Sequence, residues 1–436
     1  MVNKRVQRAI SILTIVLLGQ LSVSVAHAAN SVGKQCPKIG KISKTSAGVQ
    51  LTCEKSGKKL VWKKKSIVVA PVIPAVTDLS KTASLTPKNL FADIAKCKIA
   101  DLTTNSVGSL GFPRPRDLGV IKPTYKALVI PVSFSDAPYS DDDLERLNTK
   151  LSQVSQYYKV QSYGKVQLDF TFPEKAQWVT FTDNRSDHGL SVSVPQESKQ
   201  SFVQEVLSKT DPSLRIQDYE ILVVETTRWM GSGWGQAFPS STFSSPSGSP
   251  RSLIFQAGWS IDQWFVVAHE MGHALFGFED LYSFSAVREK KVAYKATQNW
   301  DLMSNAGGSY IGLFSWERFL ASWIVDSQVA CLTQPGDFQL FLAPLDSTAI
   351  NQKSLQIPLE PGVILVAESR KSSEYDVGAG NGGTLVYVVD TKINHGSEPI
   401  SVLGFLAKGQ TAMYKNIEIT SLDSNSTGEL VSVKIS

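Results

Sequence analysis

The stretch from Ser260 to Tyr282, SIDQWFVVAHEMGHALFGFEDLY, constrains the fold of this chain more than any other. His269, Glu270 and His273 form an H-E-x-x-H pattern, and helical residues four apart lie on one face, about one turn from each other. Two imidazoles placed in this way can bind one Zn²⁺, and the Glu between them can reach a water on the metal. The pattern therefore predicts a helix that carries a zinc site.

The residues around this pattern favour a buried helix with a defined start and end. Ser260 is a suitable N-cap, and Gln263 stands at the capping-box position. Gly277 can end the helix by taking a positive φ. Glu279 and Asp280 follow, and either carboxylate can return to the metal as a third ligand. The alternative is a core helix with two hydrogen-bonded histidines, because so short a pattern also occurs by chance.

Residues 1–29 are predicted to be a secretory signal peptide. Three basic side chains precede an apolar run that ends in Ala26-His27-Ala28, which is an A-x-A cleavage pattern. The alternative is an uncleaved membrane anchor, but the run is short for a span. No second long apolar run follows, so we expect a secreted, extracellular protein with no membrane span after signal cleavage.

The four cysteines are expected to form disulfides, because an exported protein meets an oxidising environment. Cys36 pairs most economically with Cys53, since both lie in one small module, and this leaves Cys97 for Cys331. The alternative is that Cys97 caps the metal in a latent form, because residues 66–105 have the composition of a linker or pro-segment.

Residues 30–65 form a small basic module. They hold ten lysines and one glutamate, a net charge of +9; the signal peptide carries +3 of the overall +5, so residues 66–436 carry −7. Short alternating segments predict a β unit, which a disulfide stabilises because so small a core is weak. We expect the module to bind an anionic surface such as a cell-wall polymer. The alternative is a soluble spacer, and no nucleic-acid partner is expected.

The rest of the chain divides into a catalytic domain at 106–330 and a C-terminal β-sandwich at 331–436. The first part alternates strand and helix patterns, and the second holds short strands and turns. The Gly/Ser/Pro-rich residues 231–251 are expected to form a long loop at the rim of a cleft. Ser140 is predicted to cap a helix whose first turn holds three acids (Asp141, Asp142 and Asp143). These acids complement the helix dipole, which is the preferred interpretation, and a calcium site is the alternative, which the sequence leaves open without indicating it.

Several segments, in order along the chain, carry a resemblance to a known family: KALVIPVSFSD, YYKVQSYGKVQLDF, DYEILVV, HEMGHALFGFEDLY, NWDLMSN with SWERFLASWI, and GGTLVYVVD. The chain resembles the secreted zinc metallopeptidases named for immune inhibitor A, which are metzincin-like, over roughly 125–390. The resemblance implies an α+β endopeptidase for protein or peptide substrates, with a twisted mixed sheet above the active-site helix. It also implies that Met303 lies in a turn beneath the zinc, although ordinary core packing explains a buried methionine equally well.

The third zinc ligand is the point where this sequence departs from the family pattern H-E-x-x-H-x-x-G-x-x-D. One additional residue precedes the glycine, so counting from His269 selects Glu279, whereas counting from Gly277 selects Asp280. We prefer Asp280, because the glycine sets where the chain turns back. An inactive remnant of the family is the alternative.

The expected mechanism is hydrolysis of a peptide bond by a zinc-bound water. Glu270 acts as general base and then delivers the proton to the leaving amine. Tyr310 and Tyr282 are candidate donors to the transition state. The alternative functions are a catalytically inactive surface-binding protein and a zinc hydrolase of a non-peptide amide.

Overall fold

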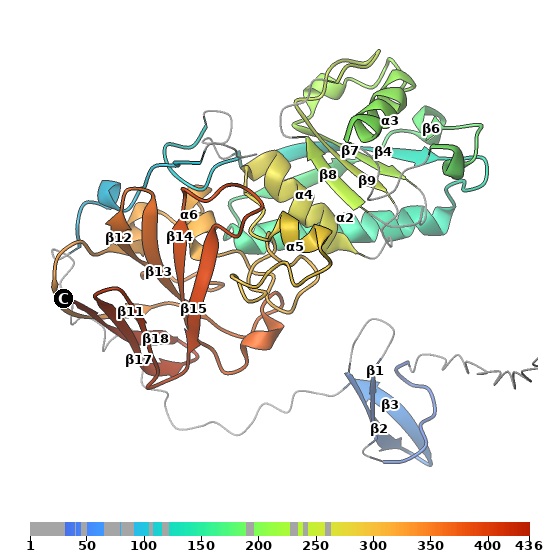
Figure 1. The fold of residues 1–436 in the computed structure, drawn as a ribbon. Helices are drawn as coiled ribbons and strands as arrows, with labels where there is room; N and C mark the ends of the chain where they lie inside the picture. The colour runs from blue at the N-terminus through green and yellow to red at the C-terminus, as the bar shows by residue number, and fades with distance from the viewer. Residues whose placement is uncertain are drawn as a thin grey trace, which may run out of the picture. The chain divides into compact units, whose positions relative to one another are not determined.

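The computed structural model describes most of the chain from residue 31 onward. The described residues are 31–39, 41–44, 50–64, 79, 91–103, 108–115, 122–188, 196–226, 234–238, 243–257 and 263–436. They belong to two compact units, Met1–Val76 and Thr77–Ser436, and each is considered by itself (Figure 1). The predicted signal peptide and most of the predicted linker lie outside the described residues. None of the described helices is long and apolar enough to cross a membrane.

The first unit contains a three-stranded antiparallel sheet. Its strands are β1 (Ile42–Lys44), β2 (Gln50–Ser56) and β3 (Lys59–Lys64). The Cys36–Cys53 disulfide packs with Leu51 and Trp62 in a small buried cluster. The predicted pairing of these two cysteines is confirmed, and the disulfide supplies the cross-link that so small a core needs.

The second unit is built on a six-stranded mixed sheet. Its strands are β4 (Thr124–Ser133), β5 (Gln167–Thr171), β6 (Val179–Thr180), β7 (Ile221–Thr226), β8 (Trp234–Phe238) and β9 (Ser252–Ala257). The order is β5-β4-β7-β9-β8, with β6 also paired to β4. All neighbours are parallel except β8, which runs antiparallel to β9.

Strand β8 corrects the expectation of one long loop over 231–251. All five of its residues, WGQAF, pair with residues Leu253–Ala257 of β9. The surrounding sequence is rich in glycine and serine, so its composition predicts a loop. The strand forms because β9 pairs with it, and not because of its own β propensity.

Helices cover both faces of this sheet (Figure 1). They are α2 (Asp141–Gln161) and α4 (Trp264–Phe276) on one face and α3 (Gln196–Ser208) on the other. Two shorter helices, α5 (Phe284–Arg288) and α6 (Ser315–Leu320), follow α4 in the chain. Short 3-10 turns are Ile94–Lys96, Lys175–Gln177, Arg185–His188, Ile216–Asp218, Asp326–Gln328 and Val377–Ala379. Because side chains alternate along a strand, Leu128 and Ile130 of β4 pack with α3, whereas Val129 packs with α2 and α4.

The start of α2 matches the sequence prediction. Ser140 is the N-cap, its hydroxyl accepts from the Asp143 N–H, and the Asp143 carboxylate accepts from the Ser140 N–H (3.0 Å). This capping box accounts for one of the three consecutive acids without a cation.

Two further sheets form the C-terminal part. The first has the order β10-β12-β13-β14-β15 and the second β11-β18-β17-β16. Their strands are β10 (Val329–Cys331), β11 (Gly336–Leu342), β12 (Ser354–Glu360), β13 (Val363–Arg370), β14 (Gly383–Asp390), β15 (Ile400–Leu406), β16 (Thr411–Tyr414), β17 (Ile417–Asn425) and β18 (Gly428–Ile435). The two sheets share one core, in which Leu365 and Val386 meet Val431. Alternate residues of β13 and β14, such as Val366 and Tyr387, enter the core around α4.

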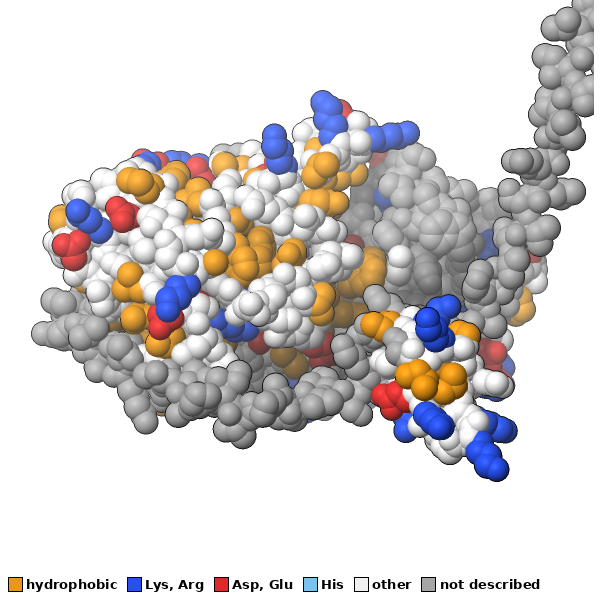
Figure 2. Space-filling model, turned by 90° about the horizontal axis from the view of Figure 1, so that it is seen from below, with side chains coloured by type: hydrophobic (Ala, Val, Ile, Leu, Met, Phe, Trp, Pro, Cys, Tyr) orange, Lys and Arg blue, Asp and Glu red, His pale blue; other side chains and the backbone are white. Residues whose placement is uncertain are grey.

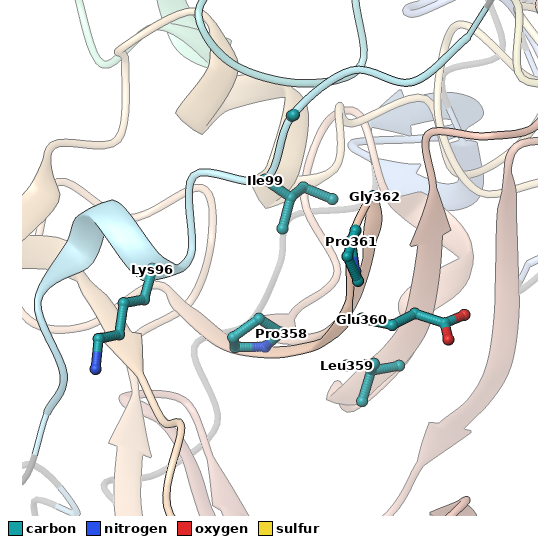
Figure 3. Close-up of a pocket in the computed structure, with 8 residues that line it drawn as sticks. Lys96, Ile99, Pro358, Leu359, Glu360, Pro361 and Gly362 are labelled. Carbon is teal, nitrogen blue, oxygen red and sulfur yellow. The ribbon is translucent and has the colours of Figure 1, made fainter.

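The segment from 91 to 115 is part of the second unit. Cys97 forms a disulfide with Cys331, as predicted, which excludes a free Cys97 as a cap on the metal. In Figure 3, Lys96 and Ile99 of this segment line a pocket together with residues Pro358–Gly362, which are the end of β12 and the turn that leads to β13. The segment therefore packs against the C-terminal sheets.

Candidate metal centre

Helix α4 carries the H-E-x-x-H residues in the interior of the second unit. Every residue from Val266 to Phe276 is buried. The N-cap is Gln263, without a side-chain hydrogen bond, so the prediction of Ser260 as N-cap is wrong; Ser260 itself lies outside the described residues. The helix is fixed by burial of its apolar side chains and not by a capping box.

The end of α4 follows the prediction. Gly277 has φ 58° and ψ 37°, the left-handed conformation that glycine adopts without strain. Its N–H donates to the His273 carbonyl (3.1 Å), and the Phe278 N–H donates to the Gly272 carbonyl (3.1 Å). This reversal brings the residues after Gly277 back along the helix.

Three side-chain atoms converge beside this reversal. Oδ1 of Asp280 lies 3.0 Å from Nε2 of His269 and 3.2 Å from Nε2 of His273, and the two Nε2 atoms are 3.2 Å apart. All three residues are buried, with exposed fractions of 5–8%. The cluster is the only group of three His, Cys, Asp or Glu side chains in the described part of the chain that is placed to hold a metal ion.

Backbone carbonyls orient both imidazoles. Nδ1 of His269 lies 3.1 Å from the Leu302 carbonyl, and Nδ1 of His273 lies 2.6 Å from the Phe278 carbonyl. Because a carbonyl only accepts, each Nδ1 carries the proton that it donates. Each Nε2 is then directed to the cluster, which is the arrangement typical of metal-binding histidines.

The cluster is also electrostatically coupled. Burial alone would lower the pKa of His273, but the charge and hydrogen bond of Asp280 raise it to about 9. Burial would raise the pKa of Asp280, but the two imidazoles hold it far below its usual range. A buried carboxylate that is held ionised between two imidazoles can bind a cation without first losing a proton.

The donor set fits Zn²⁺. Four-coordinate zinc binds nitrogen and oxygen at about 2.0–2.2 Å, so tetrahedral ligands lie about 3.3–3.6 Å from one another. The three observed separations are close to that spacing. Two imidazoles and one carboxylate leave the fourth position open, which is the composition of catalytic zinc sites.

The structure brings Asp280, and not Glu279, to the two histidines. Oε1 of Glu279 accepts from the Gly108 N–H (2.6 Å), and Oε2 lies 2.5 Å from Nδ1 of His395. Adjacent side chains in an extended turn point in different directions, so only one of the two acids faces the cluster.

Glu270 lies beside the cluster, against strand β8. The Ala237 N–H donates to its carboxylate, and a Cβ added at Gly235 would lie 2.7 Å from Oε1 of Glu270. Burial raises the pKa of Glu270, while the charges of His269 and His273 act in the opposite direction. Strand β8, which sequence reasoning missed, therefore shapes the position of this carboxylate.

Met303 is fully buried in a turn that packs against α4. Its N–H donates to Oδ1 of Asp301 (2.7 Å), and its carbonyl accepts from the Leu281 N–H (3.1 Å). A Cβ at Gly272 would lie 2.8 Å from Sδ of Met303, so helix and turn are in direct contact. A role of Met303 beneath a metal stays a prediction, because core packing accounts for the same contacts.

The two predicted tyrosine donors differ in position. Burial and the charges of Asp280 and Glu270, with a hydrogen bond to Asp280, raise the pKa of Tyr282, whose ring lies 6.2 Å from that of His269. Tyr310 instead donates to the Gly378 carbonyl (3.3 Å), and its ring lies 4.1 Å from that of Trp300. Of the two, Tyr282 is the one that contacts the cluster.

His395 is a neighbour of the cluster that sequence reasoning missed. It lies 115 residues beyond Asp280 in the chain, in the connection between β14 and β15. Its sequence surroundings contain no pattern that indicates a metal site. The only available signal was the scarcity of histidine, since the chain has five.

Comparisons with known proteins give little similarity. No protein-family model matches the chain, and no curated protein matches it. One solved structure, metalloproteinase-II from Bacteroides fragilis, aligns with TM-score 0.28 and 14% identity over 62% of this chain and 63% of that chain, so this chain spans less than two thirds of its length. Another is catalytically inactive OgpA from Akkermansia muciniphila in complex with an O-glycopeptide. It aligns with TM-score 0.26 and 13% identity over 75% of this chain and 96% of that chain. TM-scores this low do not establish a shared fold, and the function proposed below rests on the site residues.

Proposed function

We propose that this protein is a secreted zinc-dependent endopeptidase. The observation that supports the proposal is the buried convergence of His269, His273 and Asp280 through their Nε2, Nε2 and Oδ1 atoms, with Glu270 beside them. These three residues would hold the metal. When bound, zinc would lower the pKa of a bound water to about 7 and would polarise the carbonyl that is attacked.

Glu270 is the proton carrier of the proposed reaction. Its carboxylate takes a proton from the attacking water and delivers it to the leaving amine, so that the amine departs as a neutral group. The backbone of β8 holds the carboxylate in place through the Ala237 N–H, and the missing side chain of Gly235 makes room for it.

Strand β8 is also the proposed binding surface for the substrate. In the described part of the chain it is the last strand of its sheet, so one of its edges has no strand beside it. An extended peptide can add to such an edge through backbone hydrogen bonds. A peptide bound in this way would have its backbone next to Glu270, which favours a protein or peptide substrate over a small amide.

Digestion of casein by the exported protein tests this function. We expect cleavage that a zinc chelator abolishes and that added zinc restores, because the three ligands survive removal of the metal. Persistence of full cleavage in the chelator would contradict a metal mechanism. Zinc binding without any cleavage would favour the inactive surface-binding protein or the hydrolase of a non-peptide amide.

The basic module is proposed to hold the enzyme on an anionic polymer of the cell surface. Figure 2 shows lysine side chains spread over this module, seen at the lower right. Those that are exposed among the described residues are Lys34, Lys38, Lys41, Lys55, Lys58, Lys59 and Lys63. Glu54, 3.7 Å from Lys63, is the single acid of residues 30–65. The charge is therefore almost entirely of one sign.

Deletion of residues 30–65 is expected to release the protein from isolated cell walls at low salt. Attraction between exposed charges is screened within about 10 Å at 0.1 M salt, so retention of the full chain should fade as salt is added. Sedimentation with the walls over a salt series measures both effects. Retention that is unchanged by the deletion would make the module a spacer.

A matched set of substitutions separates charge from the presence of the module. Glutamine at Lys55, Lys58, Lys59 and Lys63 should weaken retention while the disulfide-linked sheet stays intact. The control replaces four exposed lysines of the larger unit, Lys175, Lys291, Lys408 and Lys415, and should leave retention nearly unchanged.

A further inference from the structure

We propose that His395 is a positioning residue that holds the carboxylate of Asp280 in its metal-binding orientation. The proposal rests on the metal site described above and deepens it. It assigns to the C-terminal sheets, through the connection between β14 and β15, a direct part in building that site.

The two oxygens of Asp280 have different partners. Oδ1 meets Nε2 of both cluster histidines at 3.0 and 3.2 Å, whereas Oδ2 lies 3.3 Å from Nε2 of His395. A carboxylate with one oxygen engaged in this way presents only the other oxygen to a metal. His395 thus favours binding through Oδ1 alone and opposes rotation of the group.

The other nitrogen of His395 is anchored as well. Nδ1 lies 2.5 Å from Oε2 of Glu279, whose Oε1 accepts from the Gly108 N–H. Nδ1 also lies 3.4 Å from the backbone nitrogen of Asp280, so both ring nitrogens face the Glu279–Asp280 segment. Glu279, His395 and Asp280 form a chain in which one carboxylate orients the imidazole and the imidazole orients the next carboxylate.

Backbone hydrogen bonds next to His395 also fix its position. The Phe284 N–H donates to the Gly396 carbonyl (2.9 Å), and the Gly396 N–H donates to the Asp280 carbonyl (3.4 Å). The Phe284 ring meets the imidazole edge to face at 4.9 Å, and the His395 side chain is 11% exposed. The connection therefore docks directly on the residues that follow α4.

Residues outside the ligand set commonly change metal affinity by about 10–100-fold when they are removed, because they orient the ligands. Two substitutions divide the functions of His395. The amide nitrogen of glutamine replaces Nε2, so His395→Gln keeps a donor toward Asp280. The amide nitrogen of asparagine replaces Nδ1, so His395→Asn keeps a donor toward Glu279 only.

The test is a zinc titration of the full chain in competition with a chromophoric chelator, for the wild type, His395→Ala, His395→Asn and His395→Gln. Melting temperatures confirm that each variant is folded. We expect His395→Ala and His395→Asn to lose about 10–100-fold in zinc affinity and His395→Gln to recover most of the loss. The visible spectrum of the cobalt-substituted protein should change in the first two variants and stay close to that of the wild type in the third.

The outcomes separate this proposal from the proposed function. Equal zinc affinity in all four proteins would remove the role of His395 and leave the metal site intact. Recovery by asparagine instead of glutamine would show that His395 acts through Glu279, as a docking contact, and would also overturn the proposal. A wild type that binds no zinc would overturn the metal site itself, and the positioning role with it.

Discussion

Replacement of Glu270 by glutamine is expected to remove nearly all casein hydrolysis while zinc stays bound. General acid–base catalysis contributes about 10²–10⁴-fold to a rate, and an amide cannot accept the proton of the attacking water. Glutamine has the size of glutamate, and its carbonyl can still accept from the Ala237 N–H. The loss should therefore come from proton transfer and not from a rearranged site.

Initial rates of casein cleavage, measured together with zinc content, check this prediction. Glu289→Gln is a suitable control, because this side chain is 56% exposed and its carboxylate pairs only with Lys291 among the ion pairs of the described residues. The control should cleave at the wild-type rate. Cleavage by Glu270→Gln at the wild-type rate would exclude Glu270 as the base.

The second large effect is expected for the third ligand. Asp280→Ala should lose zinc and activity together, because it removes the carboxylate that lies within 3.2 Å of both imidazoles. Glu279→Ala should retain most of its zinc, since Glu279 contacts Gly108 and His395 instead. Loss of the acceptor for the Gly108 N–H should nevertheless destabilise the fold by about 1–3 kcal/mol.

The features that the sequence predicts correctly depend on residues that are close together in the chain. The Ser140 capping box and the left-handed Gly277 depend on residues within one helical turn, and both occur as expected. The pairing of Cys36 with Cys53 follows from their closeness in the chain, and it leaves Cys97 for Cys331.

Contacts between distant segments explain what the sequence does not predict. His395 reaches Asp280 only because the C-terminal sheets pack on the residues after α4, and no local pattern marks that contact. Strand β8 is extended because β9 pairs with it, although its surroundings have the composition of a loop. The choice between Glu279 and Asp280 depends on side-chain directions after the reversal at Gly277, which spacing alone leaves open.

The most direct test of the proposed metal site is the zinc content per chain of the purified wild type, Asp280→Ala and Glu279→Ala, measured by elemental analysis. If one zinc site is formed by His269, His273 and Asp280, the wild type should contain about one zinc per chain. Asp280→Ala should then contain almost none, and Glu279→Ala nearly the wild-type amount. A wild type that carries no zinc and takes up none would contradict the metal site. Zinc retained in Asp280→Ala but lost in Glu279→Ala would contradict the assignment of its third ligand.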